Sequence, residues 1–140
     1  MESHNLPSIN CCISSLFFLT NVFVTYYYEY YLYSALFLGL TMSSLIHHYM
    51  KTPITCIIDK FFVFAVVGYG GYIFCNKIIN GSKQLSCAIV IAAFLGTVFL
   101  YYYGSANGQF CFAEDKEESD KWHQLLHLLS SIGHHFIVLM

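Results

Sequence analysis

Residues 44–59 read SLIHHYMKTPITCIID, and residues 122–127 read WHQLLH. Both stretches set serine, histidine or aspartate into sequence that is otherwise almost entirely apolar. Of the 140 residues, 57% are hydrophobic and only 10% are charged, whereas a soluble domain carries about 25% charged residues. Such a chain cannot cover a water-facing surface, so the composition predicts an integral membrane protein. Polar side chains are costly to keep in a membrane, and these two stretches are therefore candidates for a site.

Charge and cysteine content exclude two other classes of protein. The chain has six basic residues, all of them lysine, and a net charge of −2. It therefore has no basic patch, and we expect no binding to nucleic acid. The six cysteines lack the Cys-x-x-Cys spacing of metal clusters, and we interpret them as small buried hydrophobic residues rather than a disulfide framework.

The apolar runs predict an all-α, polytopic transmembrane bundle of about five spans, because one span needs about 20 residues. The whole chain, residues 1–140, is then a single integral-membrane domain. The first run breaks at Tyr28-Glu29-Tyr30, in an aromatic band typical of the membrane interface. The expected spans are 9–28, 31–50, 54–75, 85–103 and 121–140.

Particular residues refine this outline. Pro53 suits the first turn of the third span, where its missing N–H costs little. Gly68 and Gly71 share a helix face and predict close packing of a neighbouring helix. Residues 104–121 are expected to form a solvated acidic loop.

Lysine distribution predicts the orientation. The side holding the loops at 51–55 and 104–121 carries four lysines, and the other side carries Lys77 and Lys83. The positive-inside rule then favours the cytosol for the first side. We expect a multi-pass protein of the endomembranes, the ER or Golgi, rather than of the plasma membrane.

The polar residues of the two stretches fall at one membrane level. Ser44 and His48 lie near the end of the second span, and Asp59 lies near the start of the third. His123 and His127 lie in the first turns of the fifth span. Spacing of i, i+4 puts Ser44 and His48 on one helix face, and likewise the last two histidines.

Three histidines at one level predict a metal site. His48, His123 and His127 could bind zinc and leave a fourth position for water, whose pKa the metal lowers to about 7. Asp59 could orient this water and act as general base, and Ser44 could donate a hydrogen bond to the developing oxyanion.

Each residue also has a plainer explanation. A histidine pair at i, i+4 arises by chance, and a lone serine such as Ser44 is usually a packing residue bonded to the backbone. Asp59 could pair with Lys51 or Lys60 at the interface. The joint occurrence of all five residues at one depth favours the metal site.

Three further histidines compete for a role. His47 points about 100° away from His48 and is expected to be a packing or interface residue. His134 shares a helix face with His127 but lies about 10 Å deeper, where it could support the site or contact a substrate. His135 faces elsewhere, and we expect none of the three to be a ligand.

The ordered set of motifs resembles the CREST superfamily, which includes the alkaline ceramidases, the adiponectin-receptor and hemolysin III family, and the Per1-like proteins. The matching pattern is Ser-x-x-x-His from Ser44, Asp59 after it, and His-x-x-x-His from His123. The His-to-Asp interval is most similar to that of alkaline ceramidase, and HQLLHLLSSIG at 123–133 is similar to the last-span motif of the group. The resemblance covers three of the five expected spans.

That resemblance implies a function. His48, His123 and His127 would ligate Zn²⁺, while Asp59 and Ser44 would serve the water and the oxyanion. The reaction implied is metal-dependent hydrolysis of an amide or ester bond in a membrane lipid, such as a ceramide. These families have seven spans, however, and a bundle of five loses part of the wall of a lipid cavity unless it dimerises. The alternative is a non-catalytic membrane protein that binds a partner within the bilayer and holds a structural metal or none.

Overall fold

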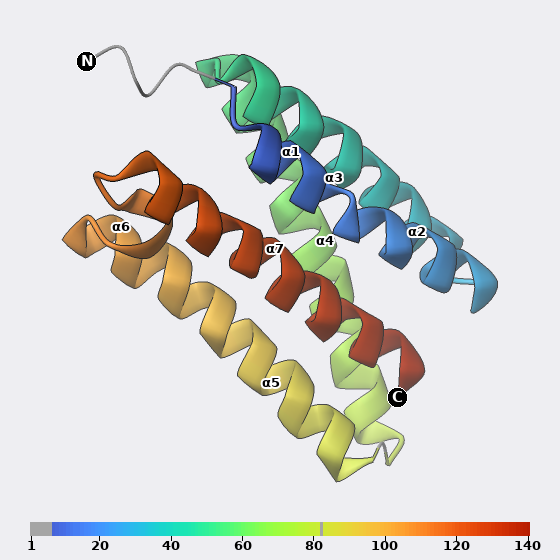
Figure 1. Ribbon diagram of the computed structural model, residues 1–140. Coiled ribbons are helices and arrows are strands. Elements are labelled where there is room, and N and C mark those ends of the chain that lie inside the picture. Colours follow the sequence, from blue (N-terminus) through green and yellow to red (C-terminus); the bar gives the residue numbers. More distant parts are fainter. Residues whose placement is uncertain (1–6, 82) are drawn as a thin grey trace.

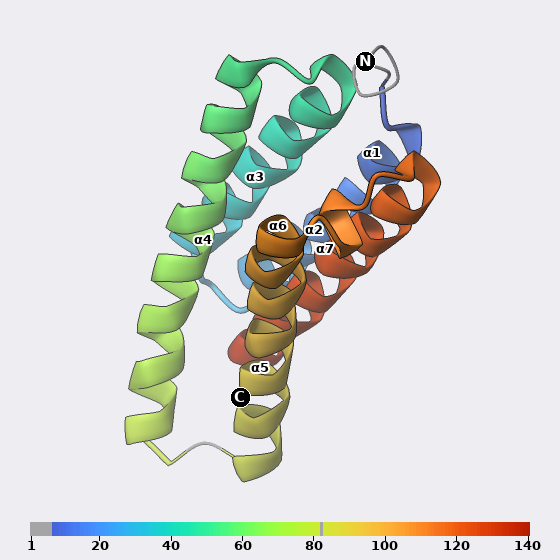
Figure 2. The same ribbon diagram turned by 90° about the vertical axis from the view of Figure 1, so that its left-hand side faces the viewer.

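The chain folds into antiparallel helices (Figures 1 and 2). The computed structural model describes residues 7–81 and 83–140. It is 87% helical, and no strand forms in those two ranges, so the prediction of an all-α fold is confirmed. In chain order the elements are α1 (Ile9–Ser15), α2 (Phe17–Tyr27), α3 (Tyr31–Met50), α4 (Pro53–Ile79), α5 (Gln84–Val98), the π-helical segment η2 (Phe99–Tyr103), α6 (Gly104–Asn107), the 3-10 turn η3 (Phe110–Phe112) and α7 (Lys116–Leu139).

The turn between α2 and α3 lies at the expected aromatic break. α2 ends at Tyr27 and α3 begins at Tyr31. Between them, Glu29 adopts a left-handed φ of 65°, and the N–H of Tyr30 donates to the carbonyl of Thr25 at 2.9 Å. The single charged residue of the first apolar run therefore occupies the turn rather than a helix.

The turn between α3 and α4 is fixed by local hydrogen bonds. Lys51, with a φ of 50°, ends α3, and its N–H donates to the carbonyl of His47 at 2.8 Å. Thr52 and Thr55 then form a reciprocal capping box at the start of α4. Pro53 occupies the first turn, as predicted. This tight connection brings the end of α3 beside the start of α4.

Among the described residues, three helical stretches are long and apolar enough to cross a membrane, namely Ile9–Tyr27, Pro53–Ile79 and Gln84–Phe112. This is consistent with a membrane protein. Helices α3 and α7 have 20 and 24 residues but are not in this set. They carry the histidines and many of the buried hydroxyl groups, and these lower their hydropathy. The arrangement with additional spans at 31–50 and 121–140 stays a prediction.

Helix α7 lies between α5 on one side and α1 and α2 on the other (Figure 1). It contacts α1, α2, α4 and α5, while α4 packs mainly against α3. The buried core joins α2, α3, α4, α5 and α7 through Phe18, Tyr33, Phe37, Leu40, Val66, Ile73, Val90, Ile137 and Val138. The helix that carries two of the candidate ligands therefore packs against four other helices.

One glycine of α4 allows a close helix contact, and it is not one of the two predicted. A Cβ at Gly70 would clash with the Tyr33 hydroxyl and would lie 3.0 Å from the His134 ring. No atom of the described residues lies within 4 Å of a Cβ at Gly68 or Gly71. The prediction of close packing at Gly68 and Gly71 was wrong. The face that α4 turns to the bundle instead includes Gly70.

Helix α7 begins earlier than expected. Its first residue is Lys116, and the side chain of Asp115 caps it by accepting from the N–H of Glu118 at 2.8 Å. Glu117 and Glu118 in the first turn suit the positive end of the helix dipole. Expecting an acidic loop was therefore wrong for residues 116–121. As a result, Asp120 is held on a helix one turn before His123.

Candidate metal centre

The three histidines predicted as ligands meet at one end of the bundle, where α3 ends and α7 begins (upper part of Figure 1). Ring centroids are 4.8 Å apart for His48 and His123, 5.2 Å for His48 and His127, and 4.7 Å for His123 and His127. Each residue offers one ligand nitrogen, and the three nitrogens lie within 4.8 Å of one another. The group could hold a metal ion.

The state of the ring nitrogens fits such an ion. His48 is only 6% exposed, and its Nε2 is buried without a hydrogen-bond partner among the described residues. Leaving a polar atom buried and unpaired costs about 1–3 kcal/mol, and a metal ion would satisfy it. In a tetrahedral zinc site with Zn–N bonds of about 2.0–2.1 Å, ligand nitrogens lie about 3.4 Å apart. The nitrogens of this group are up to 4.8 Å apart, so they would have to move closer together around a zinc ion. Imidazole also suits copper, iron and nickel.

The first helix reaches the histidine group, which the sequence did not reveal. Ser14 Oγ lies 2.8 Å from Nδ1 of His127, and both side chains are buried. Phe18, at the start of α2, packs against the same imidazole with a centroid distance of 5.1 Å. The N–H of Ser8 donates to the carbonyl of His48 at 3.0 Å. The N-terminal segment therefore contacts both helices that carry the candidate ligands.

The hydroxyl of Ser44, the predicted oxyanion donor, is hydrogen-bonded to another buried side chain. Ser44 is 1% exposed, and its Oγ lies 2.8 Å from Oγ of Ser15. Ser15 donates its own proton to the carbonyl of Cys11 at 2.8 Å. Since Ser15 has only one proton to give, Ser44 must donate to Ser15. To serve an oxyanion, the Ser44 hydroxyl would have to turn away from this partner.

Asp59, the predicted general base, lies in the second turn of α4 and contacts α3. Its Oδ1 accepts a hydrogen bond from Ser43 at 3.1 Å, and it interacts electrostatically with the neighbouring Lys60. Ser43 precedes Ser44 in the chain. Asp59 is thus tied to the same turn of α3 that carries the predicted oxyanion donor.

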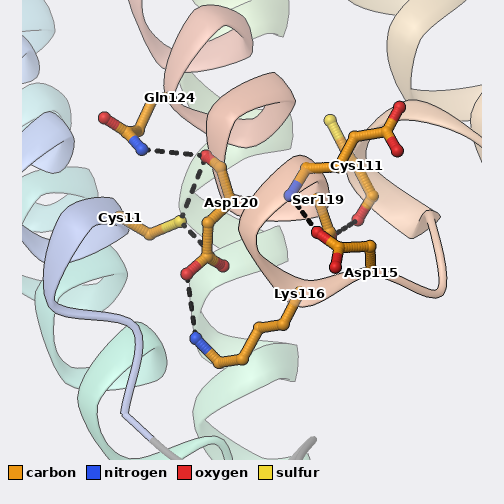
Figure 3. Close-up of polar contacts among 8 residues, drawn as sticks. Cys11, Cys111, Asp115, Lys116, Ser119, Asp120 and Gln124 are labelled. Carbon is orange, nitrogen blue, oxygen red and sulfur yellow. Dashed lines mark hydrogen bonds and ion pairs between the residues drawn. The ribbon is translucent and has the colours of Figure 1, made fainter.

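Asp120 provides a second carboxylate near the histidines. Its charge acts on both His48 and His123. Figure 3 shows its partners. Lys116 Nζ lies 2.9 Å from Oδ2, and the thiol of Cys11 lies 3.7 Å from Oδ1. Partial burial raises the pKa of the Asp120 carboxyl, but the hydrogen bond and charge of Lys116 outweigh it and leave the pKa below its ordinary value. Asp120 is therefore a carboxylate at neutral pH.

Asp120 also links helices around the site. Gln124 Nε2 donates to its carbonyl at 3.1 Å, and Ser119 Oγ donates to the carbonyl of Cys111 at 2.7 Å (Figure 3). The first bond lies within α7, the second joins α7 to η3, and the contact of Cys11 with Asp120 joins α7 to α1. All six cysteines are free thiols. The expectation that they are buried holds for Cys11 and Cys111, but Cys12, Cys56 and Cys87 are only partly buried and Cys75 is exposed.

The remaining histidines of the helices have other partners. Nδ1 of His47 lies 3.4 Å from the Thr55 hydroxyl, and His135 donates from Nδ1 to the carbonyl of Ser131 at 2.8 Å. Nδ1 of His134 is hydrogen-bonded to the hydroxyl of Tyr33 in the bundle core. These contacts agree with the expectation that the metal group consists of His48, His123 and His127.

No protein-family model, curated protein or solved structure matches this chain. The assignment of function therefore rests on the residues and their geometry.

Proposed function

We propose that this chain is a zinc-dependent hydrolase of the membrane that cleaves an amide or ester bond in a lipid, and that it is a five-span member of the CREST superfamily. The observation that carries the proposal is the group of His48, His123 and His127. Nε2 of His48 is buried without a hydrogen-bond partner in the part of the chain that the structure describes, and the ligand nitrogens of the group converge from α3 and α7.

The location of the polar residues supports the membrane part of the proposal. Helix α7 is enclosed by its neighbours, and α3 packs between α2 and α4, so neither needs to be wholly apolar to cross a bilayer. In a five-span topology the group lies at the membrane level of Lys51 and Lys116. The lysine distribution favours the cytosolic face, and the ER or Golgi is the compartment we propose.

The chain's own residues would divide the work as follows. His48, His123 and His127 would hold the zinc ion, which when bound supplies a water of lowered pKa, near 7. Asp59, oriented by Ser43, would accept a proton from water. Ser44 would donate to the oxyanion once its hydroxyl leaves Ser15.

One observation favours a second candidate, a membrane protein with a structural metal and no catalysis. The Ser44 hydroxyl donates to Ser15 rather than toward an open position. In that case Ser44→Ala and Asp59→Asn would leave function unchanged, whereas a hydrolase would lose activity in both variants.

The first experiment is the metal content of the detergent-purified chain, beside the His123→Ala/His127→Ala double variant. We expect about one zinc per chain in the wild type, as in a mononuclear three-histidine site, and none in the double variant. His134→Ala/His135→Ala is the matched control, because it removes two histidines of the same helix that have other partners. A folded wild type without metal would reject the proposal.

Activity is then tested on the zinc-loaded protein with ceramides and with ester-linked lipids in mixed micelles. Release of fatty acid that requires Asp59 and bound zinc supports the hydrolase. A zinc-loaded protein that releases no fatty acid from either class would leave the structural-metal candidate as the better description.

A further inference from the structure

We propose that Ser14 is a positioning residue that fixes the tautomer of His127 and so directs Nε2 of that imidazole to the metal. This inference rests on the metal site of the proposed function. It assigns a role to α1, which contributes no candidate ligand.

The hydrogen-bond roles follow from what each partner can do. Ser14 Oγ lies 3.0 Å from the carbonyl of Cys11 and 2.8 Å from Nδ1 of His127. A carbonyl oxygen can only accept, so the single hydroxyl proton of Ser14 goes to Cys11. Ser14 must then accept from His127, and Nδ1 of His127 carries the proton.

The consequence concerns the other nitrogen of the ring. A neutral imidazole with a proton on Nδ1 has its lone pair on Nε2. Ligand histidines commonly donate their second N–H to a fixed acceptor, which sets ring orientation and raises ligand basicity. Ser14 supplies this acceptor for His127, and Phe18 packs against the ring at 5.1 Å.

The environment makes this hydrogen bond hard to replace. Ser14 is 2% exposed and His127 is 4% exposed, so water has little access to substitute for the hydroxyl. Ser14 also lies on α1, whereas His127 lies on α7, so the bond joins helices at opposite ends of the chain. Truncating Ser14 would leave the Nδ1–H of His127 unpaired and free the ring to adopt the other tautomer.

The adjacent serine provides a matched control. Ser15, like Ser14, is buried in α1 and donates to the carbonyl of Cys11, but its other partner is Ser44 rather than a histidine. Ser14→Ala and Ser15→Ala therefore lose the same bond to the backbone. Alanine favours helix, so both variants are expected to fold.

The experiment measures zinc affinity of the detergent-purified full chain by competition with a chromophoric chelator. We expect Ser14→Ala to weaken zinc binding about 10- to 100-fold, the usual cost of losing an outer-shell partner, and Ser15→Ala to keep the wild-type affinity. Wild-type affinity in Ser14→Ala would overturn the inference. Equal losses in both variants would overturn it too, because the shared bond to Cys11 would then be the cause.

A second measurement does not depend on metal. In the metal-free protein, ¹⁵N chemical shifts of the His127 ring report which nitrogen carries the proton. We expect Nδ1–H in the wild type and in Ser15→Ala, and a mixture of tautomers in Ser14→Ala. A wild type with Nε2–H refutes the assignment of Ser14. A wild type that has Nδ1–H but binds no zinc instead refutes the proposed function and, with it, the role of Ser14 toward a metal.

Discussion

Two groups of histidine side chains lie along α7, and they differ in the hydrogen-bond partners of their ring nitrogens. At the start of the helix, His123 and His127 face His48, whose Nε2 has no partner among the described residues. Farther along, His134 is hydrogen-bonded to the hydroxyl of Tyr33. Both groups are shielded from solvent, so burial alone does not separate them. The unpartnered nitrogen is what points to a ligand.

The second group instead joins helices. Tyr33 belongs to α3, His134 to α7, and the two meet in a notch of α4 at Gly70. The His134 ring also packs edge-on against Phe37 with a centroid distance of 5.2 Å. The pair therefore ties together the three helices that carry the site, and its polar groups are satisfied by each other.

The largest expected effect breaks the first group. His48→Ala should lower zinc affinity by more than about 100-fold, since losing even an outer-shell partner costs 10- to 100-fold. His134→Ala should keep zinc binding but lower the melting temperature, because it leaves the Tyr33 hydroxyl unpaired in the core. Isothermal titration and thermal unfolding in detergent separate the two results. If both variants lose zinc equally, the distinction between the groups is wrong.

The next effect disturbs the second group without removing a polar atom. Gly70→Ala would place a Cβ in a clash with the Tyr33 hydroxyl. We expect a loss of about 2–3 kcal/mol in the free energy of unfolding, as in other overpacked cores. Gly71→Ala is the control, because no atom in the described part of the chain lies within 4 Å of its Cβ. It should be neutral or stabilise the helix by up to about 1 kcal/mol.

Thermal unfolding of the two glycine variants in the same detergent provides the comparison. Equal stabilities for Gly70→Ala and Gly71→Ala would mean that Tyr33 and His134 do not meet against α4.

The contrast also shows what sequence can predict. The i, i+4 spacing of His123 and His127, with the alternation of apolar runs, was enough to predict that His48 would join them. Helix periodicity and chain reversal determine that result, and both can be read from local sequence. The turn at Glu29 and the first turn at Pro53 were predicted for the same reason.

Contacts between helices distant in the chain could not be predicted in this way. Ser14 and Ser15 lie in an apolar run and have no spacing signal, because their partners are on α7 and α3. From the sequence, Asp120 was predicted to lie in a solvated acidic loop. In the structure Asp115 caps α7, so Asp120 belongs to that helix. Gly70 was missed because the rotation of α4 about its axis, which decides the packed face, depends on the side chains of Tyr33 and other neighbours.

A smaller effect sharpens the role of the Tyr33 and His134 pair. Tyr33→Phe keeps the ring but removes the hydroxyl, so a buried nitrogen of His134 loses its partner. We expect a loss of about 1–2 kcal/mol in the free energy of unfolding and unchanged zinc affinity. Tyr72→Phe, at a tyrosine of α4 that is 63% exposed, should have no measurable effect. Loss of zinc in Tyr33→Phe would show that the pair belongs to the metal site.

The smallest effect tests the polar shell at the start of α7. Asp120→Asn removes the ion pair with Lys116, which lies at i, i+4 and is partly buried, and should cost about 0.5 kcal/mol. The pKa of Asp120 is lowered in the folded state, so its contribution is present above the unfolded pKa of about 3.8 and is lost as the pH falls through the folded value.

Unfolding of wild type and Asp120→Asn should therefore differ at pH 7 and converge below about pH 4. Glu117→Gln breaks the fully exposed pair with Lys121 and serves as control, with no measurable change. A difference that stays the same at every pH would mean that it does not arise from the titrating charge of Asp120. The start of α7 would then resemble the hydrogen-bonded contact of His134 with Tyr33. The charge of Asp120 would have no part in stabilising the end of the bundle where the three histidines meet.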